Sequence, residues 1–257
     1  MFAHLGKWQR IGGVVAAFAA ASALPASVVT MPRNQFRHLY TMHQDARVTI
    51  QNFYGNVTIT AWDRDAVLVE AIKHSTDPRH LDDARIVVEP TADSLSIRTQ
   101  YAGSDAEHPT SVEYRITVPR RIHLDNVVLT NGQLSLDGIS GPVKASAVNG
   151  NIHALKLGGQ TELSTINGRV EANFSRTSPA NSISLSSVNG AIDLTIPSGS
   201  GANLDAQNRS GGIASNMGHE CRTEAGHRLT VKGAGPRIRL HNVNGGILIR
   251  SIEHPCT

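Results

Sequence analysis

The sequence predicts an all-β protein whose single domain is a β-solenoid, a β-helix-like stack of short coils. The main observation is a short phrase that returns at a nearly fixed interval: apolar residue, turn residue, glycine, variable residue, branched apolar residue. Its glycines Gly132, Gly150, Gly168 and Gly190 are 18, 18 and 22 residues apart. Repeats of about 20 residues with one turn signal and two short apolar strands are typical of solenoids.

The corners of the coils are predicted from Asn-Gly pairs and close variants of them. A tight corner needs positive φ, which glycine adopts freely and Asn tolerates better than most residues. Stacked Asn side chains would also hydrogen-bond from coil to coil, as amide ladders do. The expected turn residues are Gly55, Asn131, Gly132, Asn149, Gly150, Asn167, Gly168, Asn189, Gly190, Gly211, Asn244 and Gly245. Inside the coils, branched residues two positions apart, such as Ile152 with Ala154, should fill the core.

An ordinary meander of β-hairpins is the alternative fold. An Asn-Gly pair between alternating hydrophobic residues is also a strong hairpin signal. Hairpins, however, need neither a constant interval nor a constant phase between one turn and the next. This chain shows both, so the sequence favours the solenoid.

The first 26 residues are typical of an export signal. Lys7 and Arg10 form a basic start, and an apolar stretch of 14 residues follows at 11–24. That stretch is shorter than the roughly 20 residues that span a bilayer. Small residues at 21–26 suit cleavage after Ala23 or Ala26; an uncleaved anchor is the alternative. We expect an exported protein of the periplasm or cell surface, with no transmembrane segment after cleavage and a linker or leader at 27–45.

The charge balance gives no support for nucleic-acid binding. The chain has 24 Lys and Arg against 21 Asp and Glu. Lys7 and Arg10 would leave with the signal, so the mature chain carries 22 minus 21, or +1. Aromatic residues make up only 4% of the chain, and no basic cluster contains interleaved aromatics.

The solenoid domain should span residues 46–252, followed by a tail at 253–257. Asp77-Pro78 can cap one helical turn. Strict alternation at 95–101 and 112–118 predicts two half-buried strands. We expect these two to form a long-strand hairpin that flanks the solenoid. Regular coils follow from Ile122, and a looser insert at 217–229 precedes the last coil.

No group of residues indicates catalysis, a cofactor or a metal. The chain has no nucleophile elbow, P-loop or dinucleotide fingerprint. A β-helix enzyme acting on a polysaccharide needs acids gathered on one outer face, but Asp137, Asp193 and Asp205 lie at unlike positions relative to their glycines. His219, Cys221 and His227 are the one metal-like group, and their spacing is not that of a closed zinc site.

Several motifs together resemble the bacterial putative-adhesin domain, an exported β-solenoid family of cell-envelope proteins. They are Trp62-Asp63 after an early strand pair, the strand Tyr114-x-Ile116-x-Val118-Pro119, and coils of the type Val-Asn-Gly-x-Ile-x-Ala. The resemblance covers residues 46–252 and implies a non-enzymatic envelope role. It supplies no catalytic residues. The chain departs from the pattern in its stretched coils and in its pair of cysteines.

These observations predict an exported, non-catalytic cell-envelope protein that acts as an adhesin-like binding or structural module. An envelope protein or an extended polysaccharide would be its partner. Small polar residues would form the outer surface that meets it: Ser146, Ser164, Thr165, Ser186 and Ser187. The alternative is a carbohydrate-active β-helix enzyme, which would show acids converging on one face of adjacent coils.

The two cysteines, Cys221 and Cys256, predict a disulfide. A cysteine pair in an exported chain suits an oxidising compartment. The ends of a solenoid expose unpaired strand edges, and a bridge around the last coil would pin the tail as a cap. The chain-entropy model gives about 4 kcal/mol for a loop of about 35 residues. Thiol labelling of denatured, unreduced protein should find no free thiol; two labelled cysteines would contradict the bridge.

Overall fold

Nearly all of the regular secondary structure in the described residues is β-strand, and the strands form two sheets. The computed structural model describes residues 34–102, 110–217, 222–224 and 227–252. All of them belong to one unit, Pro32–Thr257. The all-β prediction is confirmed for these residues, among which the one helical element is a short 3₁₀ helix, η1 (Pro78–Asp82).

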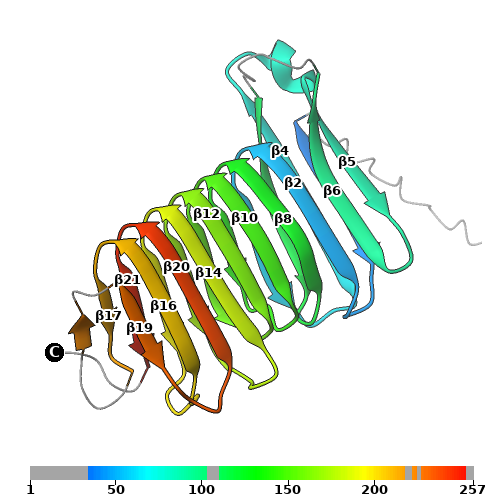
Figure 1. Cartoon of the computed structure of the whole chain (residues 1–257). Helices are drawn as coiled ribbons and strands as arrows, with labels where there is room; N and C mark the ends of the chain where they lie inside the picture. The colour runs from blue at the N-terminus through cyan, green and yellow to red at the C-terminus, as the bar shows by residue number, and fades with distance from the viewer. Residues whose placement is uncertain (1–33, 103–109, 218–221, 225–226, 253–257) are drawn as a thin grey trace, which may run out of the picture. The chain divides into compact units, whose positions relative to one another are not determined.

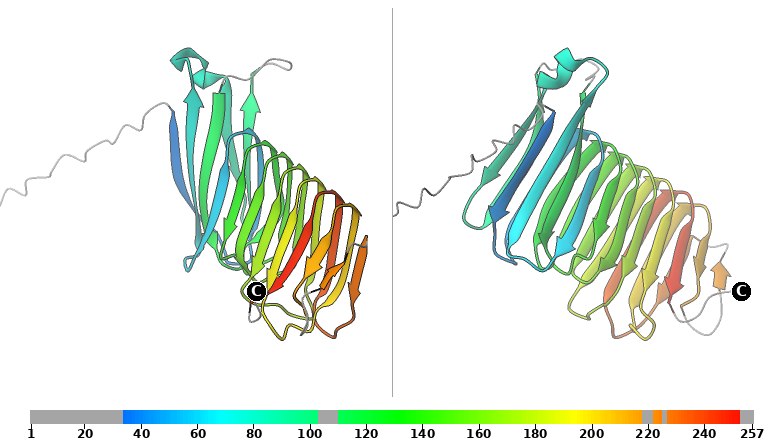
Figure 2. Two further views of the ribbon diagram at one scale, coloured as in Figure 1. Left: turned by 90° about the vertical axis from the view of Figure 1, so that its left-hand side faces the viewer. Right: turned by 180° about the vertical axis from the view of Figure 1, so that it is seen from behind.

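The two sheets contain 11 and 10 strands among the described residues. Sheet A has the order β1 (Gln35–Thr41), β4 (Ala66–Ser75), β7 (Thr110–Pro119), β3 (Val57–Trp62), β9 (Leu134–Asp137), β11 (Ile152–Leu157), β13 (Val170–Phe174), β15 (Ile192–Ile196), β21 (Ile247–Ser251), β17 (Ile213–Ser215), β18 (Arg222–Glu224). Sheet B has the order β19 (Arg228–Val231), β16 (Asn203–Ser210), β20 (Arg237–Asn244), β14 (Ser182–Asn189), β12 (Thr161–Asn167), β10 (Val143–Asn149), β8 (His123–Asn131), β2 (Arg47–Tyr54), β6 (Ser94–Tyr101), β5 (Ala84–Pro90). Figure 1 views the molecule from the side of sheet B, and Figure 2 adds a side view and a view from behind.

The chain alternates between the sheets, and equivalent positions of successive repeats pair in parallel. We call a repeat one strand of sheet B, the corner that follows it, and one strand of sheet A. Asn149 lies opposite Asn131 on one side and Asn167 on the other. A hairpin meander would pair successive strands antiparallel, which these strands do not. Because the phase is constant, inward side chains stack, and Ile152 and Ala154 are fully buried as expected.

Both ends of the stack depart from chain order. In sheet B, β20 lies between β14 and β16, and in sheet A, β21 lies between β15 and β17 (Figure 1). At the other end, β2 and β3 lie inside β6 and β7 in the same way. The last repeat of the chain therefore lies inside the stack and not at its end, and the tail expected to act as a cap, 253–257, lies outside the described residues. Antiparallel strands close the ends instead: β19 on β16, β18 on β17, β5 on β6, and β4 with β1 on β7.

The expected hairpin of two long strands is wrong. β6 pairs with β5 and β2 in sheet B, whereas β7 pairs with β4 and β3 in sheet A. The antiparallel partner of β6 is β5, and the antiparallel partner of β7 is β4. β5 escaped prediction because Ile86, Val87 and Val88 are all half-buried, so the strand lacks alternation.

Two further local predictions have different outcomes. The segment expected as a linker or leader, 27–45, contains β1, whose only partly buried apolar residues are Phe36 and Tyr40. An exposed edge strand of this kind gives little periodicity to detect. The helical turn forms as predicted, because the side chain of Asp77 accepts a hydrogen bond of 2.9 Å from the backbone N–H of Arg79.

Glycine is required at the corners for two different reasons. At Gly132 and Gly190, as at Gly55, Gly211 and Gly245, φ is positive. At Gly150 and Gly168 it is not in the left-handed range, and the expectation of positive φ there is wrong. A Cβ atom on Gly150 would instead collide with the carbonyl oxygen of Gly132, and one on Gly168 with that of Gly150. These two glycines allow the backbones of stacked corners to touch.

We predict that Gly168→Ala lowers the free energy of unfolding by more than about 2 kcal/mol, because the methyl group forces two corners apart. Gly212→Ala is the matched control: its Cβ would meet no atom within 4 Å, and its φ is not left-handed. The control should change stability by less than about 0.5 kcal/mol. Denaturant unfolding of both variants measures the difference, and equal losses would contradict the steric explanation.

Candidate binding face

The outward side of sheet B carries side chains arranged in straight rows. Ser146, Ser164 and Ser186 lie opposite one another on β10, β12 and β14, and His241 continues the row on β20. Neighbouring strands are about 4.8 Å apart, so each row repeats at that interval. We call this surface, the outward side of β10, β12, β14 and β20, the serine face.

A row of exposed apolar side chains runs beside the serines. Val148 is half-buried, whereas Ile166 is 46% and Val188 40% exposed. These residues immediately precede the corner Asn in each repeat. Apolar side chains aligned over three strands, two of them exposed, form a patch of the kind found on surfaces that meet a partner.

Side chains of the corner asparagines form a continuous amide ladder at the edge of the serine face. The Nδ2 of Asn149 donates to Oδ1 of Asn131 at 2.9 Å, and Asn167 donates to Asn149 at 2.8 Å. Asn189 continues the ladder to Asn167, and Asn244 to Asn189, both at 2.9 Å. The bond from Asn244 to Asn189 links residues 55 apart in sequence, so the ladder runs through the inserted repeat. It fixes the orientation of each amide.

Two residues expected on this surface are buried instead. Thr165 is 3% and Ser187 1% exposed. The Oγ1 of Thr165 donates to the carbonyl oxygen of Gly150 at 2.9 Å, and the Oγ of Ser187 to that of Gly168 at 3.0 Å. They point inward because they lie one residue out of phase with Ser164 and Ser186.

The same inward position carries polar residues in other repeats, and the sequence reasoning missed the pattern. Asn242 donates to Gly190 at 3.0 Å, and Asn208 donates to Gly245 at 2.7 Å. Asn52 donates to Gly55 at 3.0 Å. Each of these residues stands three positions before its own corner glycine. A polar residue at this constant offset could have been recognised in the sequence. Its side chain donates a hydrogen bond to a corner carbonyl group that the backbone hydrogen bonds of the sheet leave unpaired.

A cluster of tyrosines lies at the β2 and β6 end of sheet B. The ring of Tyr101 meets Phe53 and Tyr54 edge-on, with centroids 6.1 and 5.8 Å away. Burial raises the pKa of Tyr101 to about 12, so its hydroxyl stays protonated at neutral pH. Deeper inside, the hydroxyl of Tyr114 lies 2.7 Å from Oγ1 of Thr99, and burial raises the pKa of Tyr114. This cluster fastens the first repeats to one another.

Acidic residues on sheet A form one cross-strand pair that the sequence reasoning missed. Glu171 lies opposite Asp193 on neighbouring strands. Glu171 is 3.0 Å from Nδ1 of His153, and Asp193 is 3.2 Å from Arg169. His153, Glu171 and Asp193 each stand three positions after a corner glycine. This constant offset in the sequence would have revealed that they form a row across the strands. The arrangement places each carboxylate beside a basic side chain.

The acids considered from sequence do not converge. Asp137 is paired with Lys156 at 3.2 Å on sheet A, and Asp205 is paired with Arg228 at 3.0 Å on sheet B. Within the described ranges, no three His, Cys, Asp or Glu residues are placed to hold a metal ion. The candidate ligands His219 and Cys221 lie outside those ranges, as do Cys256 and the predicted signal segment at 1–26. The disulfide therefore stays a prediction. No helix in the described part of the chain is long and apolar enough to cross a membrane.

Comparison with known proteins gives a likeness of fold. No family model and no curated protein matches the sequence. A structure described as a putative cell adhesion protein from Clostridium sporogenes aligns with a TM-score of 0.50 and 11% identity, over 84% of this chain and 99% of the other. A putative adhesin from Bacteroides fragilis aligns with a TM-score of 0.40 and 12% identity, over 86% and 98%.

A third structure, a putative adhesin from Parabacteroides merdae, aligns with a TM-score of 0.35 and 12% identity, over 84% and 96%. The description of the Clostridium structure agrees with that of the family that the sequence motifs resemble. Identity of this level shows a likeness of fold alone, and of these three structures the one from Clostridium has the highest TM-score.

We predict that Ser187→Ala destabilises the protein by about 1–3 kcal/mol, because it removes the donor to the buried carbonyl oxygen of Gly168. Ser186→Ala is the matched control, since that neighbouring side chain faces outward. Its effect should stay within about 0.5 kcal/mol. Thermal unfolding of the two variants distinguishes the inward position from the outward one; a neutral Ser187→Ala would show that the hydrogen bond is dispensable.

Proposed function

We propose that this chain is an exported, non-catalytic binding module of the cell envelope, similar in role to adhesins, and that its domain is a β-solenoid. The parallel registers in both sheets support the solenoid form. The adhesin descriptions of the structural neighbours are consistent with this role. The basic start and short apolar run of residues 1–26 support export to the periplasm or cell surface. Intact-mass measurement of envelope-derived protein tests cleavage after Ala23 or Ala26.

The observation that carries the binding role is the register of the serine face. Ser146, Ser164 and Ser186 form one row, and the apolar residues at 148, 166 and 188 form the next. A partner lying across the strands meets the same chemistry every 4.8 Å or so, and weak single contacts add along it. A flat surface of this kind suits an extended polysaccharide or another protein better than a small molecule, which needs a deep pocket.

A polysaccharide-cleaving enzyme is the second candidate, and one observation favours it. Glu171 and Asp193 lie opposite each other, and a hollow of about 330 Å³ borders Asp193 on sheet A. Glycoside hydrolysis uses such a pair, with one carboxyl protonated. Each carboxylate already has a basic side chain as its partner, Glu171 with His153 at 3.0 Å and Asp193 with Arg169 at 3.2 Å, which argues against that role.

We predict that Ile166→Glu abolishes binding of the partner, because it places a charge in the middle of the exposed apolar row. Leu155→Glu is the matched control, since Leu155 is also exposed, at 42%, but lies on sheet A. A glycan array and a capture experiment with envelope extract supply the ligands. The test compares both variants with the wild type and includes an assay for polysaccharide cleavage.

Loss of binding in Ile166→Glu alone supports the serine face. Equal binding by both variants would contradict it. Turnover that disappears in Glu171→Gln would favour the enzyme instead.

A further inference from the structure

Exposed cations gather on the inserted repeat, at one end of the serine face. The outward residues of β20 are Arg237, Arg239 and His241, all exposed. They lie opposite Ser182, Ser184 and Ser186 on β14, and opposite Asn203, Asp205 and Gln207 on β16. Exposed Arg209 and Arg228 lie on β16 and the adjoining β19. We call the outward side of β20, β16 and β19 the arginine strip.

Most of the arginines on this strip have no ion pair among the described residues, and what distinguishes them from other unpaired cations, such as Arg85 and Arg115, is that they gather on adjoining strands. The Lys and Arg side chains away from the strip that have a carboxylate partner are Arg37, Arg47, Arg79, Arg98, Arg120, Arg121, Lys144, Lys156 and Arg169. On the arginine strip, Arg209, Arg237 and Arg239 form no ion pair with any described residue. Asp205 lies opposite Arg239 on the neighbouring strand, and its carboxylate is 3.0 Å from Arg228.

The concentration of charge is not explained by the composition of the chain. Without the signal segment, cations exceed acids by only one (22 minus 21). Like charges on one face of a sheet repel each other, so the cluster opposes folding slightly. Outward positions on β20 could carry serine, as they do on neighbouring β14. The cluster is therefore suited to an anionic partner.

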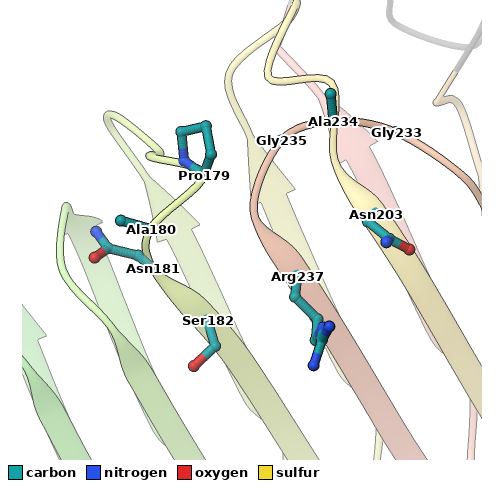
Figure 3. Close-up of a pocket in the computed structure, with 9 residues that line it drawn as sticks. All are labelled: Pro179, Ala180, Asn181, Ser182, Asn203, Gly233, Ala234, Gly235 and Arg237. Atoms are coloured by element: carbon teal, nitrogen blue, oxygen red, sulfur yellow. The ribbon is translucent and has the colours of Figure 1, made fainter.

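A pocket of about 390 Å³ lies at one end of the strip (Figure 3). Arg237 lines it between Ser182 and Asn203, and the loops at 179–181 and 233–235 form the rest of its wall. The second loop packs directly on the backbone at 200–202, because Gly233 and Gly235 have no side chain that would collide with it. A guanidinium, a hydroxyl and an amide thus surround a space large enough for one sugar ring.

We propose that the arginine strip binds an acidic polysaccharide, a chain with carboxylate or sulfate groups on its sugars. Two arginines on one strand face, two residues apart, have Cα atoms about 6.6 Å apart, a spacing that suits anionic groups on neighbouring sugars. The planar fork of arginine binds carboxylate and sulfate oxygens in pairs. Serine and amide side chains between the cations can bond sugar hydroxyls. This inference rests on the proposed function and names its partner.

The observations favour a polysaccharide over a nucleic acid. Proteins that hold single strands stack bases on aromatic side chains. The described outward residues of β14, β20 and β16 include no Phe, Tyr or Trp. The strip is flat and offers no helix or ribbon for a groove of duplex DNA.

The test compares polygalacturonate, which has a carboxylate on every sugar, with its fully methyl-esterified form, which has the same backbone without charge. Dextran sulfate and an oligothymidylate complete the set of probes. Binding is measured by calorimetry with the full mature chain. We expect the wild type to bind polygalacturonate or dextran sulfate at least about tenfold more tightly than the ester, with loss of binding in about 1 M salt.

The variant Arg237→Ala/Arg239→Ala should weaken acidic-polymer binding at least about tenfold. Its control is Arg85→Ala/Arg115→Ala, which removes the same charge from two exposed arginines of β5 and β7. The control should keep wild-type affinity, and thermal unfolding of both should match the wild type.

Three results would overturn the inference: equal binding of the acidic polymer and the ester, a β20 variant that binds as well as the wild type, or tighter binding of oligothymidylate than of any acidic polysaccharide. If a neutral polymer binds and only Ile166→Glu prevents it, the proposed function stands and this inference falls. If no glycan and no envelope protein binds the wild type, both fall.

Discussion

The contact between stacked corners is the constraint on which the rest of this structure depends. The carbonyl oxygen of one corner glycine lies where the next glycine would carry its Cβ, from Gly132 through Gly150 and Gly168 to Gly190. Such contact locks successive repeats in one phase. The constant phase then allows the Asn ladder at the edge, the inward donors to glycine carbonyls, and the straight rows on the serine face. A side chain at any of these corners would disturb all three.

Insertion of both terminal repeats solves a problem that parallel stacks share. An open end presents a whole strand edge of unpaired N–H and C=O groups, which invites association with other chains. Here the repeats at the two chain ends, β2–β3 and β20–β21, are covered by repeats from the interior of the sequence. The covering repeats carry antiparallel strands, which do not offer the parallel register of the stack. These two repeats, β2–β3 and β20–β21, are thereby held between other repeats, whereas β1 lies at the edge of sheet A.

The structure of a single repeat could be predicted from the sequence, but the order in which the repeats stack could not. The phrase around Asn149-Gly150 implied a corner, two strands and a constant phase, because each of these follows from spacing alone. The same uniformity hides the order: Asn244 can bond Asn189 as well as any neighbour in sequence, so nothing local marks β20 for a place beside β14. Face assignments depended on a single residue of phase. That is why Thr165 and Ser187 were predicted to face outward. The equivalent residue of another repeat, Asn242, also stands three positions before its corner glycine and points inward.

Internal repetition also allows function to be separated from fold. Outward positions of sheet B are not needed for strand pairing or for the core, so each repeat is free to vary there. The position of Ser146, Ser164 and Ser186 stays small and polar through three repeats and becomes His241 on β20, where the adjoining outward positions are Arg237 and Arg239. Packing does not require this change, because the inward residues of β20, Ile238 and Leu240, match Ile183 and Leu185 of β14. A difference confined to the solvent side of an otherwise conforming repeat points to what that repeat meets.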